Sequence, residues 1–147
     1  MKAVIIIIMT SVCVAVPVIA QEFGQEYRTV PPKVRFVSMP VYIDSGESAL
    51  AAYQFELKTT AGRIEIVGIE NGEHPAFNEP PYYDPAALAN DRVIIAAFDT
   101  GDNLPVGRTR VTTIQLQILG DIDPQYELDL TVAADSDGNE IAAEITY

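Results

Sequence analysis

Apolar and polar residues alternate with a period of two in much of the chain, most clearly in Leu50–Leu57, Arg110–Ile118 and Tyr126–Ala134. Successive side chains of a β-strand point to opposite faces of the sheet, so each segment predicts a strand with one buried and one solvated face. The buried side of the first segment is predicted to hold Tyr53, Phe55 and Leu57.

Further strands are predicted at 33–43, 63–70, 92–98 and 141–145. Turn sequences such as Asp137-Gly138 separate the strands about every 8–12 residues, which is typical of sandwiches and barrels. The run from Val93 to Phe98 is apolar throughout, which predicts a strand buried on both faces. The fold class is therefore all-β: an antiparallel, jelly-roll-like β-sandwich of about eight to nine strands with no major helix.

One segment does not follow this pattern. Residues 73–91 contain Pro75, Pro80, Pro81 and Pro85, which exclude a central strand because proline cannot donate to the ladder. Asp84 followed by Pro85 predicts one short helical turn. Long irregular segments often carry function, so we treat 73–91 as a candidate binding loop.

The N-terminus predicts three parts. Residues 1–20 read as a signal peptide, with Lys2, an apolar run and Ala20 before the cleavage point. Residues 21–32 are polar with two prolines and predict a flexible lead-in, and 33–147 form the sandwich domain. We therefore expect a secreted protein, extracellular or periplasmic, that does not contact the membrane after signal cleavage. An uncleaved N-terminal anchor, or a lipid anchor on Cys13, are the alternatives.

Charge and cysteine content narrow the function. The formal net charge is −12, and such a surface repels nucleic acid and anionic lipid, which argues against both as partners. Cys13, the only cysteine, lies in the predicted signal peptide. The secreted chain would therefore have no disulfide, thiolate metal site or cysteine nucleophile, and its stability must come from the core.

No pattern predicts an enzyme. His74 is the only histidine, no GxSxG motif accompanies it, and zinc sites rarely use one histidine and no cysteine. The 21 acidic residues include no pair that their spacing selects for glycoside hydrolysis. We expect no catalytic residue and interpret His74 as structural.

Asp135–Glu140 resembles a calcium loop only in part. With Gly138 at the sixth position of an EF-hand, the first position would be Ala133 instead of an acid. A hairpin turn explains the segment better. We predict no metal site and no cofactor, and weak calcium binding by loop acids stays open.

Four segments resemble the strand pattern of cohesin-type modules, the extracellular β-sandwiches that bind dockerin domains. They are Ala51–Leu57, Ile64–Gly72, Val93–Gly101 and Val111–Ile114, and the likeness covers about residues 34–146. The resemblance implies a partner lying across the sheet face that contains the Phe55 strand. The implied partner-binding residues are Ala52, Gln54, Glu56, Arg92 and Asp99. Many cohesins carry Asn or Asp where Gln54 stands.

The first function hypothesis is therefore a secreted, non-catalytic module that binds an extracellular protein, of dockerin type or another kind. In a dockerin complex the calcium would belong to the partner. The alternative is a carbohydrate-binding module that binds polysaccharide through Phe77, Tyr82 and Tyr83, although the chain has no tryptophan for such a platform. A third hypothesis is an assembly subunit of the cell envelope that self-associates through sheet edges.

Overall fold

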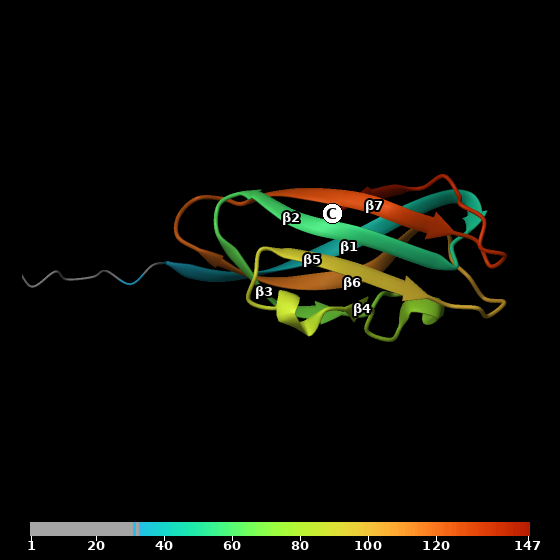
Figure 1. Cartoon of the computed structure of the whole chain (residues 1–147), viewed down its shortest axis with the longest axis horizontal. Coiled ribbons are helices and arrows are strands. Elements are labelled where there is room, and N and C mark those ends of the chain that lie inside the picture. The colour runs from blue at the N-terminus through green and yellow to red at the C-terminus, as the bar shows by residue number, and fades with distance from the viewer. Residues whose placement is uncertain (1–30, 32) are drawn as a thin grey trace, which may run out of the picture. The chain divides into compact units, whose positions relative to one another are not determined.

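Two four-stranded antiparallel sheets form the protein (Figure 1). A computed structural model describes residues 31 and 33–147; the predicted signal peptide and most of the lead-in lie outside these residues. Residues 31–147 form one compact unit. The predicted all-β sandwich is confirmed, with eight strands and no α-helix among the described residues. No helix in the described part of the chain is long and apolar enough to cross a membrane.

The first sheet, called here the β1 sheet, has the strand order β3-β6-β1-β8. Its strands are β3 (Ile64–Glu70), β6 (Val106–Leu119), β1 (Val34–Ala49) and β8 (Glu144–Thr146). The second, called here the β2 sheet, has the order β4-β5-β2-β7. Its strands are β4 (Tyr82–Tyr83), β5 (Arg92–Phe98), β2 (Ala52–Ala61) and β7 (Gln125–Ala134).

The inner faces of both sheets supply the core. The predicted alternation in β2 is confirmed, because Phe55 and Leu57 are fully buried and Tyr53 nearly so. They pack in one cluster with residues of the β1 sheet such as Ile114 and Leu116. These buried side chains hold the sheets together by the hydrophobic effect, with no cysteine among the described residues to staple them.

Residues 73–91 cover one side of the sandwich with two single 3₁₀ turns, η1 (Pro75–Phe77) and η2 (Pro85–Ala87). The predicted helical turn at Asp84-Pro85 is confirmed as η2. The side chain of Asp84 accepts a hydrogen bond from the Ala86 amide at 2.9 Å and caps the turn. Between the two turns, β4 joins the edge of the β2 sheet next to β5.

Two expectations differ from the structure. The β5 run is not buried on both faces, because Val93 and Ile95 are buried but Ile94 is 49% exposed. Ile94 and Phe98 lie on the outer face of the β2 sheet, where both are exposed. The segment after Asp137-Gly138 makes only one bridge to β7, from Glu140 to Ala134, and then pairs with β1 as β8. The chain crosses between sheets here, so the turn does not start a full hairpin.

Tyr53 gives the fold a testable pH dependence. Its hydroxyl donates to the Val111 carbonyl at 3.1 Å, and burial raises the pKa of Tyr53 well above its ordinary value. The unfolded chain therefore loses this proton more readily than the folded chain as pH rises. We expect the unfolding free energy to fall above about pH 10 by up to ~1.4 kcal/mol per pH unit from this residue. Urea unfolding of wild type and Tyr53→Phe between neutral and alkaline pH measures it. Parallel pH profiles of the two proteins would contradict the assignment.

Candidate functional site

An exposed apolar patch lies on the outer face of the β2 sheet. Phe98 is 63% exposed, Tyr82 67%, Ile94 49% and Val132 42%. These residues are neighbours in the sheet, because Ala96 of β5 pairs with Tyr82 of β4 on one side and with Gln54 of β2 on the other. We call this surface the apolar patch, made of Ala52, Tyr82, Ile94, Ala96, Phe98 and Val132.

Two aromatic rings are the largest part of the apolar patch. Tyr82 and Phe98 are stacked with ring centroids 6.0 Å apart and an angle of 11° between the ring planes. Both rings stand clear of the core, although an aromatic side chain gains most when it is buried. Such a pair is typical of a surface that is covered by a partner.

The other end of the same face is charged. The Arg92 guanidinium forms an ion pair with Glu56, and the Lys58 ammonium lies 3.9 Å from a carboxylate oxygen of Glu127. Asp129 stands opposite Glu56 in the register. The face thus has an apolar end and a charged end, which we call the charged end below.

Gln54 and Thr131 connect the two ends. The Gln54 side-chain amide donates to the Thr131 hydroxyl at 3.1 Å, and that hydroxyl donates to the Gln54 carbonyl at 3.1 Å. The register between β2 and β7 shifts at this point, so Thr131 is the extra residue of a bulge. The bulge fixes the Gln54 side chain on the outer face, where it can offer hydrogen-bonding atoms to a partner.

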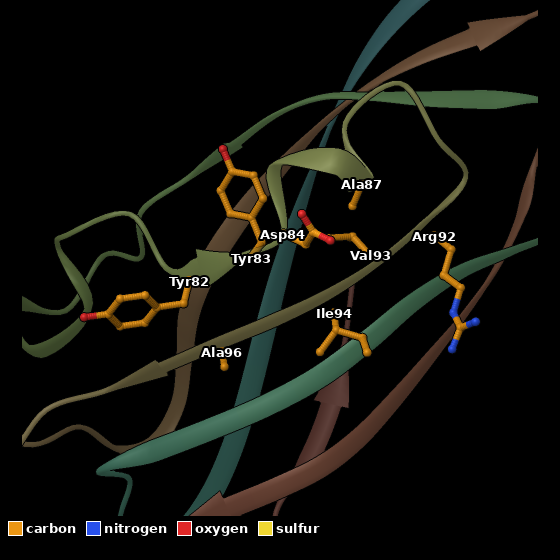
Figure 2. A pocket seen from close by; sticks show the side chains of 8 residues that line it. All are labelled: Tyr82, Tyr83, Asp84, Ala87, Arg92, Val93, Ile94 and Ala96. Carbon is orange, nitrogen blue, oxygen red and sulfur yellow. The ribbon is translucent and has the colours of Figure 1, made fainter.

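A hollow of about 440 Å³ adjoins the apolar patch (Figure 2). It lies between β5 and the segment from Tyr82 to Ala87. Its walls are mostly apolar, and Asp84 and Arg92 are the two charged residues that line it. A hollow of this kind beside exposed aromatic rings suits the insertion of one or two partner side chains.

Four of the five predicted partner-binding residues lie on this face. In the register Ala52 pairs with Phe98 and Glu56 with Ile94, so the β2 residues lie beside the β5 residues of the apolar patch. Asp99 is different. Its carboxylate accepts a hydrogen bond from the Gly101 amide at 2.6 Å, and its own amide donates to the Ala51 carbonyl. Asp99 therefore shapes the loop at the rim of the face.

The three aromatic residues predicted to bind glycan do not share one surface. Phe77 is 2% exposed and packs edge-on against Tyr53, with ring centroids 5.1 Å apart, so it belongs to the core. Tyr83 is half-buried against the core because neighbouring strand residues point to opposite faces. Figure 2 shows Tyr82 and Tyr83 extending in different directions. Only Tyr82 remains as a surface ring, and its partner is Phe98.

Sequence reasoning missed Phe98, Ile94 and Val132. The signal for the first two was the alternation within β5, because Phe98 and Ile94 are in phase with the exposed Arg92. Val132 could not be found in this way, since the bulge at Thr131 changes the phase of β7. An unbroken alternation would have placed Val132 on the inner face.

The remaining candidate groups have local structural roles. The His74 imidazole Nδ1 accepts a hydrogen bond from the Ala76 amide at 3.2 Å and starts η1. The Asp135 carboxylate accepts from the Asn139 side chain and from the Asn139 and Asp137 amides, which lowers the pKa of Asp135. Among residues 33–147 no three His, Asp or Glu side chains are grouped so that they could hold a metal ion.

Comparison with known proteins identifies the fold. No family model matches the chain, and no curated protein matches its sequence. A complex of CaDoc0917 with CaCohA2 matches at a TM-score of 0.57 and 11% identity, over 74% of this chain and 82% of that one. A type I cohesin–dockerin complex from Clostridium thermocellum matches at 0.56 and 15%, over 74% and 82%. A non-cellulosomal cohesin from the hyperthermophilic archaeon Archaeoglobus fulgidus matches at 0.56 and 14%, over 76% and 75%. The fold is of cohesin type, as the resemblance implied.

Proposed function

We propose that this chain is a secreted, non-catalytic binding module that recognises a protein of dockerin type through the outer face of the β2 sheet. The observation that carries the proposal is the apolar patch with its stacked Tyr82 and Phe98 rings. The cohesin-type fold supports a protein partner, because two of the similar structures are complexes, one of them of a cohesin with a dockerin.

The energetics favour a covered patch. Burying one large apolar side chain is worth about 1.5–3 kcal/mol, and the patch has four of them in contact with water. Folding alone gives a chain with net charge −12 no reason to keep Phe98 and Tyr82 in one exposed cluster. Contiguous exposed apolar surface of this kind marks interaction sites.

The charged end of the face would set the orientation of a bound partner. Glu56 is paired with Arg92 and Glu127 with Lys58, whereas Asp129 has no ion-pair partner among the described residues. A partner would therefore place an apolar helix or strand face on the apolar patch and a basic side chain near Asp129. Such complementary charges raise the association rate and fix the direction of docking.

A second candidate function is polysaccharide binding, which the nearly parallel Tyr82 and Phe98 rings favour. Sugar rings stack on flat aromatic surfaces, and these two rings expose one. Under this function, retardation on a polysaccharide affinity gel disappears in Phe98→Ala and remains in Tyr83→Phe. Absence of retardation on every gel removes the candidate.

The chain from Gln21 serves as bait in an extract of secreted and envelope proteins from the source organism, once with calcium and once with EDTA. The affinity of the captured protein for the chain is then measured. We expect Gln54→Arg/Glu56→Arg to weaken binding at least about tenfold, since two new positive charges would stand within the contact surface. Release by EDTA would show that the complex needs a divalent cation.

The matched control is Val67→Arg, an exposed position on the other sheet, where binding should be unchanged. Equal affinity of Gln54→Arg/Glu56→Arg and wild type would remove this face from the proposal.

A further inference from the structure

Among the described residues, one edge of β1 is paired over only three of its 16 residues. On one side β1 pairs with β6 from Val34 to Asp44, and again at Ala49. On the other side β8 pairs with it only at Tyr42, Ile43 and Asp44. From Val34 to Pro40, β1 has no neighbour on that side among the described residues.

The register tells which backbone groups are free. The Gly120 amide donates to the Lys33 carbonyl at 2.8 Å, so these two residues form a hydrogen-bonded pair. Such pairs alternate along an antiparallel ladder, and the pairing is regular up to Val41. Every second residue therefore directs its N–H and C=O away from β6 into the open edge, namely Val34, Phe36 and Ser38. Pro40 has no N–H and limits this set of donors.

The open segment is also apolar. Phe36 is 70% exposed, Val34 47% and Val37 40%. Long, exposed, apolar edge strands pair readily with another chain, so proteins usually protect them. The protection consists of short length, bulges or charges.

The outermost strands of the two sheets have such protection among the described residues. β4 has two residues and β8 has three. β3 contains a bulge between Ile66 and Gly68 and ends in Glu70, and β7 presents Glu127 and Asp129. Between Val34 and Ser38 the β1 edge has no bulge, and its one charged residue, Arg35, is paired with Asp123.

Charge indicates which molecule fits this edge. The chain has a net charge of −12, so two copies repel each other over most of their surface. At the open edge the charges cancel, because Lys33 lies 3.5 Å from Asp121 and Arg35 pairs with Asp123. Two copies can therefore pair here without an unpaired like charge at the contact itself, while the overall negative charge keeps the association weak.

We propose that two copies of the chain form a dimer by antiparallel pairing of their β1 edges, with the two-fold axis at Phe36. In this register Val34 lies opposite Ser38 of the second copy, and the three free N–H groups of each copy gain an acceptor. The two Phe36 rings meet on one face, and each Arg35 lies opposite Val37 instead of another Arg35. An edge that pairs with itself about a two-fold axis forms a closed dimer and not a fibre.

The dimer is independent of the proposed partner site. It joins two β1 sheets, whereas the apolar patch lies on the outer face of the β2 sheet. Only one short strand segment of each copy takes part, so we expect less buried area than the roughly 1,200 Å² of a stable interface, and a weak dimer that dissociates on dilution. A dimer would offer two partner sites.

Sedimentation velocity of the chain from Gln21, from about 10 μM to about 1 mM, tests the proposal over the range expected of a weak contact. The wild-type mass should rise towards that of a dimer. Phe36→Lys would place two ammonium groups opposite each other and raise the dissociation constant at least about tenfold. The matched control Val67→Lys is exposed on the far edge of the same sheet and should associate as wild type does.

Amide hydrogen exchange by NMR tests the register itself. Exchange of the Phe36 and Ser38 amides should slow as the concentration rises, whereas Val37, which faces β6, is protected at every concentration. A wild-type monomer at the highest concentration would overturn the proposal. So would a dimer that Phe36→Lys leaves unchanged, or one in which the Phe36 amide gains no protection.

Discussion

Tyr82→Ala/Phe98→Ala lowers the affinity for the protein partner by at least about a hundredfold, since each central aromatic side chain of an interface is typically worth about 2 kcal/mol or more. The melting temperature stays near that of wild type. Both rings are more than 60% exposed, at 67% and 63%, so their removal leaves no cavity in the core. Calorimetric titration with the captured partner measures the affinity.

The single variants show whether the rings act together. Tyr82 and Phe98 stack on each other, so their effects should not add, and a double-mutant cycle should give a coupling energy of roughly 0.5–1.5 kcal/mol. The control Val67→Ala, on the outer part of the other sheet, should bind as wild type does. An affinity of Tyr82→Ala/Phe98→Ala within threefold of wild type would contradict the proposed site.

Phe77→Ala has the opposite effect, a large loss of stability with little change in binding. Phe77 is 2% exposed and packs edge-on against Tyr53, and its carbonyl accepts a hydrogen bond from the Gly72 amide at 2.7 Å. Truncating a buried phenylalanine typically costs about 3–5 kcal/mol, because it removes buried area and leaves a cavity. Urea unfolding measures the loss.

A comparison with Phe98→Ala separates the structural role of Phe77 from the proposed binding role of Phe98. Phe98→Ala should unfold at nearly the same urea concentration as wild type, since the ring is 63% exposed. Folded Phe77→Ala should retain its affinity for partner or polysaccharide. Wild-type stability combined with reduced ligand binding in Phe77→Ala would return Phe77 to the binding surface.

The alternation of apolar residues predicted the strands well, because one face of each strand is covered by the opposite sheet. It correctly predicted the buried positions of β2, including Phe55, and the fold class, an antiparallel β-sandwich. It failed in β5, where Ile94 and Phe98 are apolar but exposed. An apolar residue in the sequence indicates a position that is buried in the functional protein. The burial can come from a partner instead of from the chain's own second sheet.

Other features depend on tertiary contacts that no local pattern encodes. Phe77 lies within a proline-rich loop, yet the two 3₁₀ turns carry the loop back so that its ring enters the core. The bulge at Thr131 moves Val132 to the outer face. After the crossing from β7, β8 pairs with β1 only at Tyr42–Asp44, which leaves Val34–Pro40 without a neighbour on that side among the described residues.

The proposed binding face and the open β1 edge belong to different sheets, so the two proposals can be combined. A dimer through β1 would present two apolar patches. Two linked sites raise the apparent affinity for a partner with repeated binding segments through effective concentration, without any new contact. The affinity for a single-site partner would be the same for monomer and dimer.

The most direct test of the central claim is NMR chemical-shift mapping of the ¹⁵N-labelled chain with the captured partner. The account predicts that amide signals on the outer face of the β2 sheet move, with the largest changes at Gln54, Ile94, Ala96 and Phe98, while Val67 and Gln115 on the β1 sheet stay in place. Changes confined to the β1 sheet, with Ile94 and Phe98 unaffected, would contradict it.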